Sequence, residues 1–269
     1  MDLSNIKLVV TDMDGTLLNS KSEVSKRFFN LFKELKKHDI HFVAASGRQH
    51  HSIVDKLESI KKEITIIAEN GAFVTQRGQE VSTITLPAKR VHQLIPVLRN
   101  IENTYFTLCG KKSAYIETYD EPFIGILKEY YAAFEFVDDL TKVVEDDFFK
   151  IAAYHFDSSE KYIYPAVKHY ENELQVKVSG EHWVDISQPN ANKGYALKIL
   201  QDKLHISTEE TMVFGDYNND LEMLALSRYS FAMENAHPNV KNVANFHTKS
   251  NDEEGVENVL EQLLQAKRH

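Results

Sequence analysis

The chain has 269 residues, of which 42% are hydrophobic and 26% charged; such values are ordinary for a globular protein with a sizeable core. Its net charge of −9 argues against non-specific binding to nucleic acid or to an acidic membrane surface. The single cysteine, Cys109, excludes an intrachain disulfide and a cysteine-based zinc site and fits a cytoplasmic protein. No secretory signal or membrane-spanning run is visible, so we expect a soluble monomer or small homo-oligomer that binds neither nucleic acid nor membrane.

The first part of the chain alternates predicted strands and helices. An apolar run at residues 8–11 predicts a buried strand that ends at Asp12, and residues 22–37 carry apolar side chains at helical spacing. Residues 40–45 and 64–68 predict two more buried strands, with a short helix between them at residues 53–60. Strands separated by helices form right-handed β–α–β units, so we expect a parallel sheet.

The middle of the chain has a different order. Residues 89–101, 121–134 and 160–173 are predicted helices. Residues 105–108, 114–117 and 149–156 are predicted strands, and residues 175–186 a pair of strands. This mixed order predicts an antiparallel sheet with helices on one face, and therefore a second domain.

The alternation of helix and strand then resumes to the end of the chain. Helices are predicted at 193–204, 219–226 and 256–264, and strands at 211–215 and 230–233. We therefore predict an α/β fold. Its core is a Rossmann-like, doubly wound parallel sheet formed by residues 1–84 and 187–269, and residues 85–186 are an inserted second α/β domain.

Polar side chains gather where the predicted strands end or a helix begins. Asp12-Met13-Asp14-Gly15-Thr16 follows the first strand, Ser46-Gly47 the second and Gly215-Asp216-Tyr217-Asn218-Asn219-Asp220 the fourth, while Lys193-Gly194 opens a helix. Because parallel strands end at one edge of the sheet, these clusters can converge. Carboxylates hold Mg²⁺, while a hydroxyl, backbone N–H groups and a lysine bind phosphoryl oxygens. The combination predicts phosphoryl transfer.

Simpler explanations account for only part of this pattern. Taken alone, Asp12 and Asp14 could be turn residues, but turn chemistry does not explain the other clusters. The sequence contains neither a P-loop nor a Gly-x-Gly-x-x-Gly motif, so a carboxylate nucleophile is the more economical hypothesis. The last cluster is not an EF-hand loop, because Leu221 and Ser227 stand where glycine and glutamate are needed.

The four clusters, in this order and at this spacing, resemble the haloacid dehalogenase (HAD) superfamily of aspartate-nucleophile phosphatases. The form Gly215-Asp216-x-x-Asn219-Asp220 and the long insertion are similar to its Cof-type branch. The resemblance implies an HAD-like core with an inserted α/β cap domain that determines substrate specificity. Many relatives carry threonine where this chain has Ser46, which keeps the hydroxyl.

The resemblance also implies a role for each residue that matches a motif. Asp12 is expected to attack phosphorus and form an aspartyl-phosphate, while Asp14 acts as acid for the leaving alcohol and then as base toward water. Mg²⁺ would be bound by the Asp12 carboxylate, the Asp14 backbone carbonyl and the Asp216 carboxylate. Asp220 would anchor the site from behind and could orient Lys193 or a metal-bound water. The phosphoryl group would be held by the Met13 N–H, Ser46, the Gly47 N–H, Lys193 and Asn219.

Several residues have two interpretations. Arg48 could bind phosphate or pair with a carboxylate. Asn70 could contact substrate, although a tight turn with positive φ explains Asn70-Gly71 better. Tyr217 could line a substrate pocket, whereas Trp183 and Cys109 are expected in the core.

The expected function is a Mg²⁺-dependent phosphatase acting on small phosphorylated metabolites. The family suggests sugar phosphates or cofactor phosphates such as flavin mononucleotide (FMN) or pyridoxal phosphate. The alternatives are a phosphotransferase or phosphomutase with the same nucleophile, and a metabolite-binding regulator without turnover.

Overall fold

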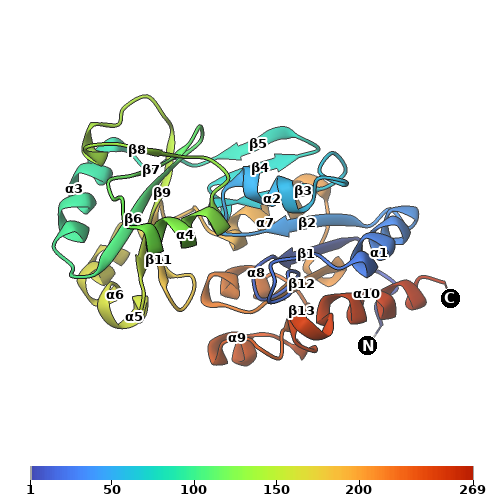
Figure 1. Cartoon of the computed structure of the whole chain (residues 1–269). Helices are drawn as coiled ribbons and strands as arrows, with labels where there is room; N and C mark the ends of the chain where they lie inside the picture. The colour runs from blue at the N-terminus through green and yellow to red at the C-terminus, as the bar shows by residue number, and fades with distance from the viewer. Residues whose placement is uncertain (1, 269) are drawn as a thin grey trace.

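The computed structural model describes residues 2–268 and contains two β-sheets. The larger has the strand order β14-β13-β12-β1-β2-β3-β4-β5, and the smaller has the order β10-β11-β9-β6-β7-β8. Each sheet with its helices forms one layered unit, and we call them the eight-stranded and the six-stranded unit (Figure 1). Among residues 2–268, no helix combines the length and apolar character needed to cross a membrane.

The eight-stranded unit is built around a parallel sheet with β1 near its centre. The parallel strands are β1 (Leu8–Asp12), β2 (His41–Ala45), β3 (Thr65–Ala68), β12 (Thr211–Gly215), β13 (Tyr229–Ala232) and β14 (Phe246–His247). Every residue of β1, β3, β12 and β13 is buried, as expected for strands covered on both faces. The predicted parallel α/β sheet is thus confirmed.

An antiparallel hairpin that was not predicted extends this sheet. It consists of β4 (Phe73–Gln76) and β5 (Gln79–Thr83). Its two-residue turn, Arg77-Gly78, has φ of 52° and 78°, the left-handed conformation that matches the twist of paired strands. The signal in the sequence was the glycine at the turn, between short runs that contain the β-branched residues Val74-Thr75 and Val81.

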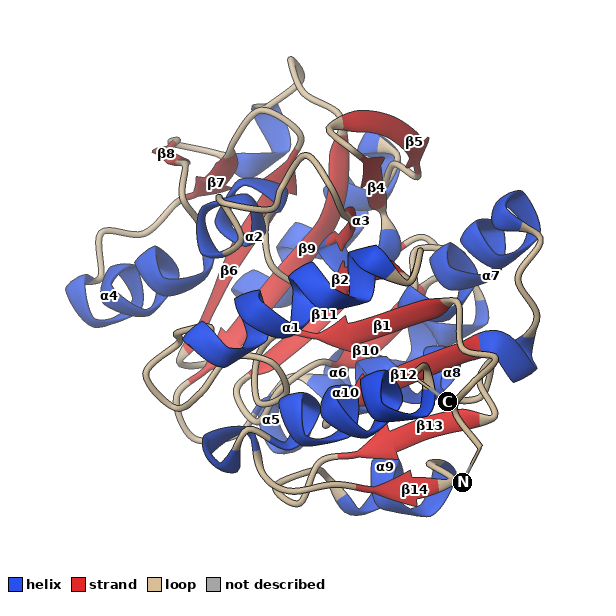
Figure 2. Cartoon of the chain, turned by 90° about the vertical axis from the view of Figure 1, so that its right-hand side faces the viewer, coloured by secondary structure: helices blue, strands red, loops and turns tan. Residues whose placement is uncertain are grey.

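Helices cover both faces of the eight-stranded sheet. They are α1 (Lys26–Lys37), α2 (His50–Lys56), α7 (Lys193–Leu204), α8 (Leu221–Leu224), α9 (Pro238–Val243) and α10 (Gly255–Ala266). Helix α1 begins after Ser25, whose side chain accepts the Phe28 N–H. Figure 2 shows α1 and α10 side by side across one face, whereas α7 and α8 contact each other on the opposite face. This is the predicted doubly wound arrangement.

The six-stranded unit differs from its prediction in two ways. Its strands are β6 (Thr104–Gly110), β7 (Ala114–Ile116), β8 (Phe134–Phe136), β9 (Phe148–His155), β10 (Gln175–Val178) and β11 (Trp183–Ser187). The sheet is not wholly antiparallel, because β7 and β8 pair in parallel. The helix between them, α4 (Glu121–Tyr130), is the crossover that such a pair requires.

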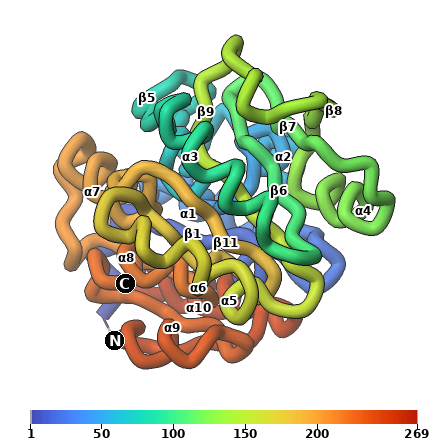
Figure 3. Tube along the Cα trace, turned by 90° about the vertical axis from the view of Figure 1, so that its left-hand side faces the viewer, coloured from blue at the N-terminus to red at the C-terminus, as the bar shows by residue number. Residues whose placement is uncertain are grey.

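The helices of the six-stranded unit also lie on both faces of its sheet, not on one as predicted. Helix α3 (Ala88–Arg99) packs on the face that carries Ile151 and Ala153, together with the short helices α5 (Ser159–Tyr162) and α6 (Tyr164–Val167). Helix α4 packs on the other face, against Ala152 and Tyr154. Alternate residues of β9 therefore face different layers. Figure 3 views the molecule from this side, with β6, α3 and α5 in front of the larger sheet.

Candidate active site

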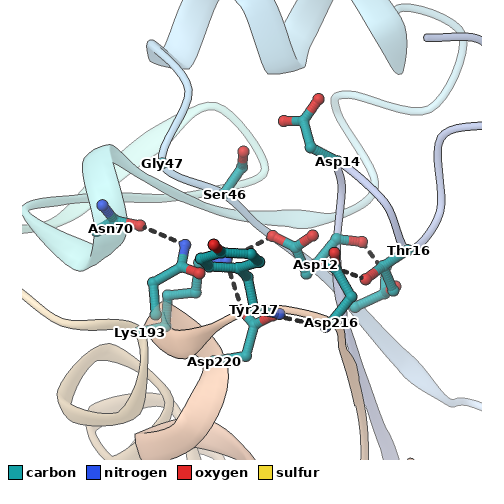
Figure 4. A network of polar contacts seen from close by, with 12 residues as sticks. Asp12, Asp14, Thr16, Ser46, Gly47, Asn70, Lys193, Asp216, Tyr217 and Asp220 are labelled. Atoms are coloured by element: carbon teal, nitrogen blue, oxygen red, sulfur yellow. Dashed lines mark hydrogen bonds and ion pairs between the residues drawn. The ribbon is translucent and has the colours of Figure 1, made fainter. Parts of the chain in front are cut away.

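The four polar clusters meet at the carboxyl edge of the eight-stranded sheet (Figure 4). Strands β1, β2 and β12 run parallel and end at Asp12, Ala45 and Gly215, so the residues that follow them lie at one edge. Helix α7 begins at Lys193, and the Asn192 side chain caps its N-terminus by accepting the Tyr195 N–H. The predicted convergence of the clusters is therefore present in the structure.

A cavity of about 250 Å³ opens at this edge, between the two units. The eight-stranded unit contributes mainly polar side chains to its wall, among them Asp12, Asp14, Ser46, Arg48, Asp216 and Asn219. The six-stranded unit contributes aromatic and charged side chains, among them Tyr130, Tyr131, Lys150, Glu181, Trp183 and Asp185. One wall is thus suited to a charged group, and the other places aromatic rings beside charged side chains.

Asp12 lies at the centre of the polar wall and is only 4% exposed. Its Oδ1 accepts a hydrogen bond from Lys193 Nζ at 2.5 Å, and the same ammonium donates to Asp220 Oδ1 at 2.7 Å. Its Oδ2 is buried and has no hydrogen-bond partner among the described residues. Burying a carboxylate oxygen without a hydrogen-bond donor costs free energy of folding. The Asp12 Oδ2 is therefore available to a ligand.

Asp216 lies beside Asp12 and is held by Thr16, whose hydroxyl donates to its Oδ1 at 3.0 Å. Gly15 makes room for it: with φ of +72°, a Cβ at this position would lie 2.3 Å from Asp216 Oδ2. Only glycine combines this backbone conformation with so close an approach. The Asp-Gly-Thr sequence thus serves to place a second carboxylate beside the first.

The acidic cluster fits a divalent cation. Carboxylate oxygens of Asp12, Asp216 and Asp220 lie within 4.8 Å of one another. Burial raises the pKa of Asp12 to about 7 even though Lys193 favours its charged form, and burial together with the neighbouring Asp12 raises the pKa of Asp216 well above its ordinary value. One lysine does not balance this many carboxylates, and an added cation would.

Asp220 is placed to orient its neighbours rather than to ligate. Its Oδ1 accepts from Lys193, and its Oδ2 accepts the backbone N–H groups of Asp216 at 2.9 Å and Tyr217 at 3.1 Å. Both oxygens are therefore occupied, which leaves Asp12 and Asp216 as the carboxylates with free capacity. This geometry supports the anchoring role expected for Asp220.

The loop after β2 brings a hydroxyl and a backbone amide to the cavity. Ser46 and Gly47 line the wall, and the Ser46 Oγ accepts the Arg48 N–H at 3.1 Å. Asn219 also lines the cavity, and its amide donates to Asn70 Oδ1 at 3.0 Å. Lys193 is fully buried, and its ammonium contacts Asp12 and Asp220 at the base of the site.

Arg48 pairs with the other carboxylate of the first motif. Its Nε and Nη2 donate to the two oxygens of Asp14 at 2.7 and 2.6 Å and form a bidentate ion pair. Arg48 also contacts the six-stranded unit, because its Nη1 donates to the Glu129 carbonyl and its guanidinium lies 4.7 Å from the centre of the Tyr130 ring. In Figure 4 the Asp14 carboxylate points away from the Asp12–Lys193 cluster.

Other sequence-based expectations have mixed outcomes. Asn70 and Gly71 have φ of 54° and 102°, which confirms the turn; Asn70 is 5% exposed and lies outside the cavity wall. Tyr217 lines the cavity, and Cys109 is buried as expected. Trp183 was expected in the core but is only partly buried and lines the cavity, because β11 turns its odd-numbered residues toward the larger unit.

Some cavity and site residues were missed from the sequence. Thr16 stands in the first motif, so its hydroxyl could have been singled out. Lys150 and Asp185 lie in predicted strands, and a charged residue inside an apolar run is a recognisable signal. Tyr130 lies in a predicted helix whose aromatic residues suit core packing and a flat substrate ring equally well; in the structure its ring contacts Arg48 at the cavity.

Comparison with known proteins is consistent with this geometry. A family model described as haloacid dehalogenase-like hydrolase matches residues 9–260. The chain is 33% identical to 5-amino-6-(5-phospho-D-ribitylamino)uracil phosphatase YbjI of Escherichia coli K12, over 97% of each chain. It is 29% identical to phosphatase YwpJ of Bacillus subtilis, over 96% of this chain and all of that one. The crystal structure of SMU.1108c from Streptococcus mutans UA159 matches with a TM-score of 0.91 at 31% identity, covering 97% of this chain and 99% of that one.

Proposed function

Because this chain belongs to the haloacid dehalogenase-like hydrolase family and is a phosphatase, we propose that it hydrolyses small phosphorylated metabolites through an aspartyl-phosphate on Asp12. The membership confirms the resemblance drawn from the motifs, including the Cof-type branch. The observation that carries the proposal is the Asp12 carboxylate. One of its oxygens is held by Lys193, and the other is buried without a donor at the wall of the cavity.

The proposed reaction has two steps. An Asp12 oxygen attacks phosphorus, the bond from phosphorus to the leaving oxygen breaks, and Asp14 gives that oxygen a proton. Water then attacks the phosphorus of the aspartyl-phosphate, Asp14 takes its proton, and phosphate and free Asp12 are released. For the first step Asp14 must be protonated, so the leaving group has to displace the Arg48 ion pair seen here.

Mg²⁺ is the cofactor that we propose, held by the carboxylates of Asp12 and Asp216 and the backbone carbonyl of Asp14. The donorless Asp12 oxygen and the excess of buried carboxylates support this choice. When bound, the cation would neutralise that excess and allow a phosphate dianion to approach a carboxylate nucleophile. Ser46, the N–H groups of Met13 and Gly47, Lys193 and Asn219 remain the proposed phosphoryl ligands.

Residues 85–186 are proposed as a cap domain that excludes water and selects the leaving group. Their aromatic side chains at the cavity, Tyr130, Tyr131 and Trp183, favour a flat ring on the leaving group. The relative from Escherichia coli is named for a substrate that joins a pyrimidine ring to a phosphorylated ribityl chain. We therefore propose phosphate esters that carry a ring, such as this compound, FMN or pyridoxal phosphate, alongside simple sugar phosphates.

A kinetic screen tests the proposal. Enzyme treated with a chelator should not hydrolyse p-nitrophenyl phosphate, and added Mg²⁺ should restore hydrolysis. A panel of the phosphate esters named above should then identify the preferred leaving group, with release of inorganic phosphate measured in each case. Formation of an isomeric phosphate ester instead would indicate a mutase, and no turnover of any ester would exclude the proposed reaction.

Replacing Asp14 by asparagine should separate proton transfer from metal binding. We expect kcat for a metabolite ester to fall by about 10²–10⁴-fold, the usual contribution of general acid–base catalysis. The Mg²⁺ concentration for half-maximal activity should change little, because the proposed metal contact is the backbone carbonyl. The rate of aspartyl-phosphate formation from p-nitrophenyl phosphate should fall less than the rate from the metabolite ester, since p-nitrophenolate leaves without a proton. Equal losses of metal binding and turnover would contradict this role.

A further inference from the structure

A buried lysine of the six-stranded unit reaches the loop that follows β2 in the other unit. Lys150 on β9 is 2% exposed, and its Nζ donates to the Gly47 carbonyl at 2.6 Å. The ammonium also lies 3.2 Å from a carboxylate oxygen of Glu69 and 3.2 Å from one of Asp185. Lys150 shares its face of β9 with Ala152, a residue of the cavity wall. The strand therefore directs this charge toward the active site.

The loop of Ser46, Gly47 and Arg48 has every carbonyl held by a donor. The Ser46 carbonyl accepts the Asn70 N–H at 3.0 Å, the Arg48 carbonyl accepts the Glu69 N–H at 3.1 Å, and Lys150 holds the carbonyl between them. In a trans peptide the N–H points opposite to the C=O. Each hydrogen bond to a carbonyl therefore also fixes the direction of the N–H of the following residue, because the two groups belong to one planar peptide.

Lys150 consequently orients the Ser46 hydroxyl through one peptide plane. The N–H opposite the Gly47 carbonyl belongs to Arg48, and it donates to Ser46 Oγ at 3.1 Å. The preceding peptide is fixed by Asn70, and its N–H, that of Gly47, has no acceptor within residues 2–268. The hydroxyl and this amide are the groups that the loop offers to the cavity.

Asp185 links the lysine to a second part of the site. Its Oδ1 faces Lys150, and its Oδ2 accepts from the Asn70 side-chain amide at 2.5 Å. The Asn70 Oδ1 in turn accepts from Asn219 at 3.0 Å. One buried network from the six-stranded unit thus holds the β2 loop and the Asn219 side chain together.

Holding the two units together does not require such a network. Burying an ammonium and two carboxylates carries a large desolvation cost that apolar contacts avoid. Lys177 provides a comparison, because its Nζ also bridges the units, to Glu222 Oε1 at 2.5 Å, but it is 22% exposed and touches no residue of the β2 loop. The position of Lys150 on a loop carbonyl is what distinguishes it.

We propose that Lys150 is a positioning residue for phosphoryl binding: from the cap domain, it sets the orientation of the Ser46 hydroxyl and the Gly47 loop. The inference rests on the proposed function of that loop. It assigns to the six-stranded unit a part in binding the transferred group itself, in addition to any contact with the leaving group. The loop is in its binding conformation only while the two units are docked.

The test compares Lys150→Met with Lys177→Met, the matched removal of a bridging lysine away from the loop. The variant Lys150→Met/Glu69→Gln removes one charge of each sign. Since burial raises the pKa of Glu69 to about 7, glutamine resembles its neutral form and should restore stability. For each protein, kcat/KM is measured with p-nitrophenyl phosphate and with one metabolite ester, and melting temperature is recorded. The dissociation constant of inorganic phosphate is measured by calorimetry with Mg²⁺ present, which requires no turnover.

We expect both Lys150 variants to lose about 10²-fold in kcat/KM, the scale of a small misplacement of binding groups. The loss should be equal for the two esters, and inorganic phosphate should bind more weakly. Lys177→Met should match the wild type in kcat/KM for both esters and in the dissociation constant of phosphate. The proposal would be overturned if phosphate affinity and kcat/KM recovered together with the melting temperature in Lys150→Met/Glu69→Gln. It would also be overturned if the loss of kcat/KM were confined to one of the two esters. A wild-type protein that binds phosphate but turns over no ester would refute the proposed function alone.

Discussion

Asp12→Asn is expected to abolish turnover while leaving the fold intact. The amide cannot attack phosphorus, so kcat should fall by about 10⁴-fold or more, as when an enzyme loses its nucleophile. Rapid-quench analysis with a radiolabelled phosphate ester should show no phosphoryl group on the variant, although the wild type becomes labelled. Normal labelling of the variant would exclude Asp12 as the nucleophile.

Stability measurements provide the control for this variant, because they show that the loss of activity is not unfolding. In the folded protein without metal, burial raises the pKa of Asp12 from 3.8 to about 7. The folded state therefore binds the proton more tightly than the unfolded state does, and the stability of the wild type declines as pH rises from about 4 to about 7. Asparagine does not titrate, so the metal-free variant should melt higher than the wild type at pH 8, with a smaller difference at pH 4. A variant that melts lower than the wild type at pH 8 would contradict this electrostatic account.

Lys193→Met should have the largest effect on stability of the substitutions considered. Lys193 is fully buried between Asp12 and Asp220, and its removal leaves two buried carboxylates without their cation. Breaking a buried ion pair from one side costs about 3–5 kcal/mol. We expect a decrease of this size in the free energy of unfolding in urea without metal, together with loss of phosphatase activity.

Two further variants separate the structural and chemical parts of this effect. Lys198→Met removes an exposed pair with Asp202 on the same helix and should change the free energy of unfolding little. Lys193→Met/Asp220→Asn removes one buried charge of each sign, so it should recover stability without recovering activity. Recovery of activity in this double variant would show that Lys193 serves only to stabilise the fold.

The parallel core could be predicted because local pattern and burial agree there. The strand at Thr211–Gly215 and the helix at Lys193–Leu204 were predicted with the bounds that the structure shows, since a strand buried on both faces is a continuous apolar run. The elements that were missed are short or at the sheet edge. Strand β14 has two residues and α9 has six, too few to give a periodic signal.

The six-stranded unit was harder to predict because its layers depend on contacts distant in sequence. Strands β7 and β8 pair in parallel, and α4 is the crossover connection between them. No local feature of the sequence distinguishes this parallel pairing from an antiparallel hairpin. Trp183 shares a face of β11 with Asp185, and the docking of the two units places that face at the cavity, so its position there did not follow from its apolar character.

By itself, the sequence determined the α/β core, the family and the edge at which Asp12, Ser46, Lys193 and Asp216 would meet. These features follow from strand direction and from short motifs, which are local properties of the chain. Only the tertiary structure decided which groups these residues bind: Arg48 on Asp14, Asp220 on Lys193, and Lys150 on the Gly47 carbonyl. Such contacts join residues 27 to 103 positions apart. Their geometry is determined when the strands, loops and helices that carry these residues pack together, because a buried charge must find its partner there.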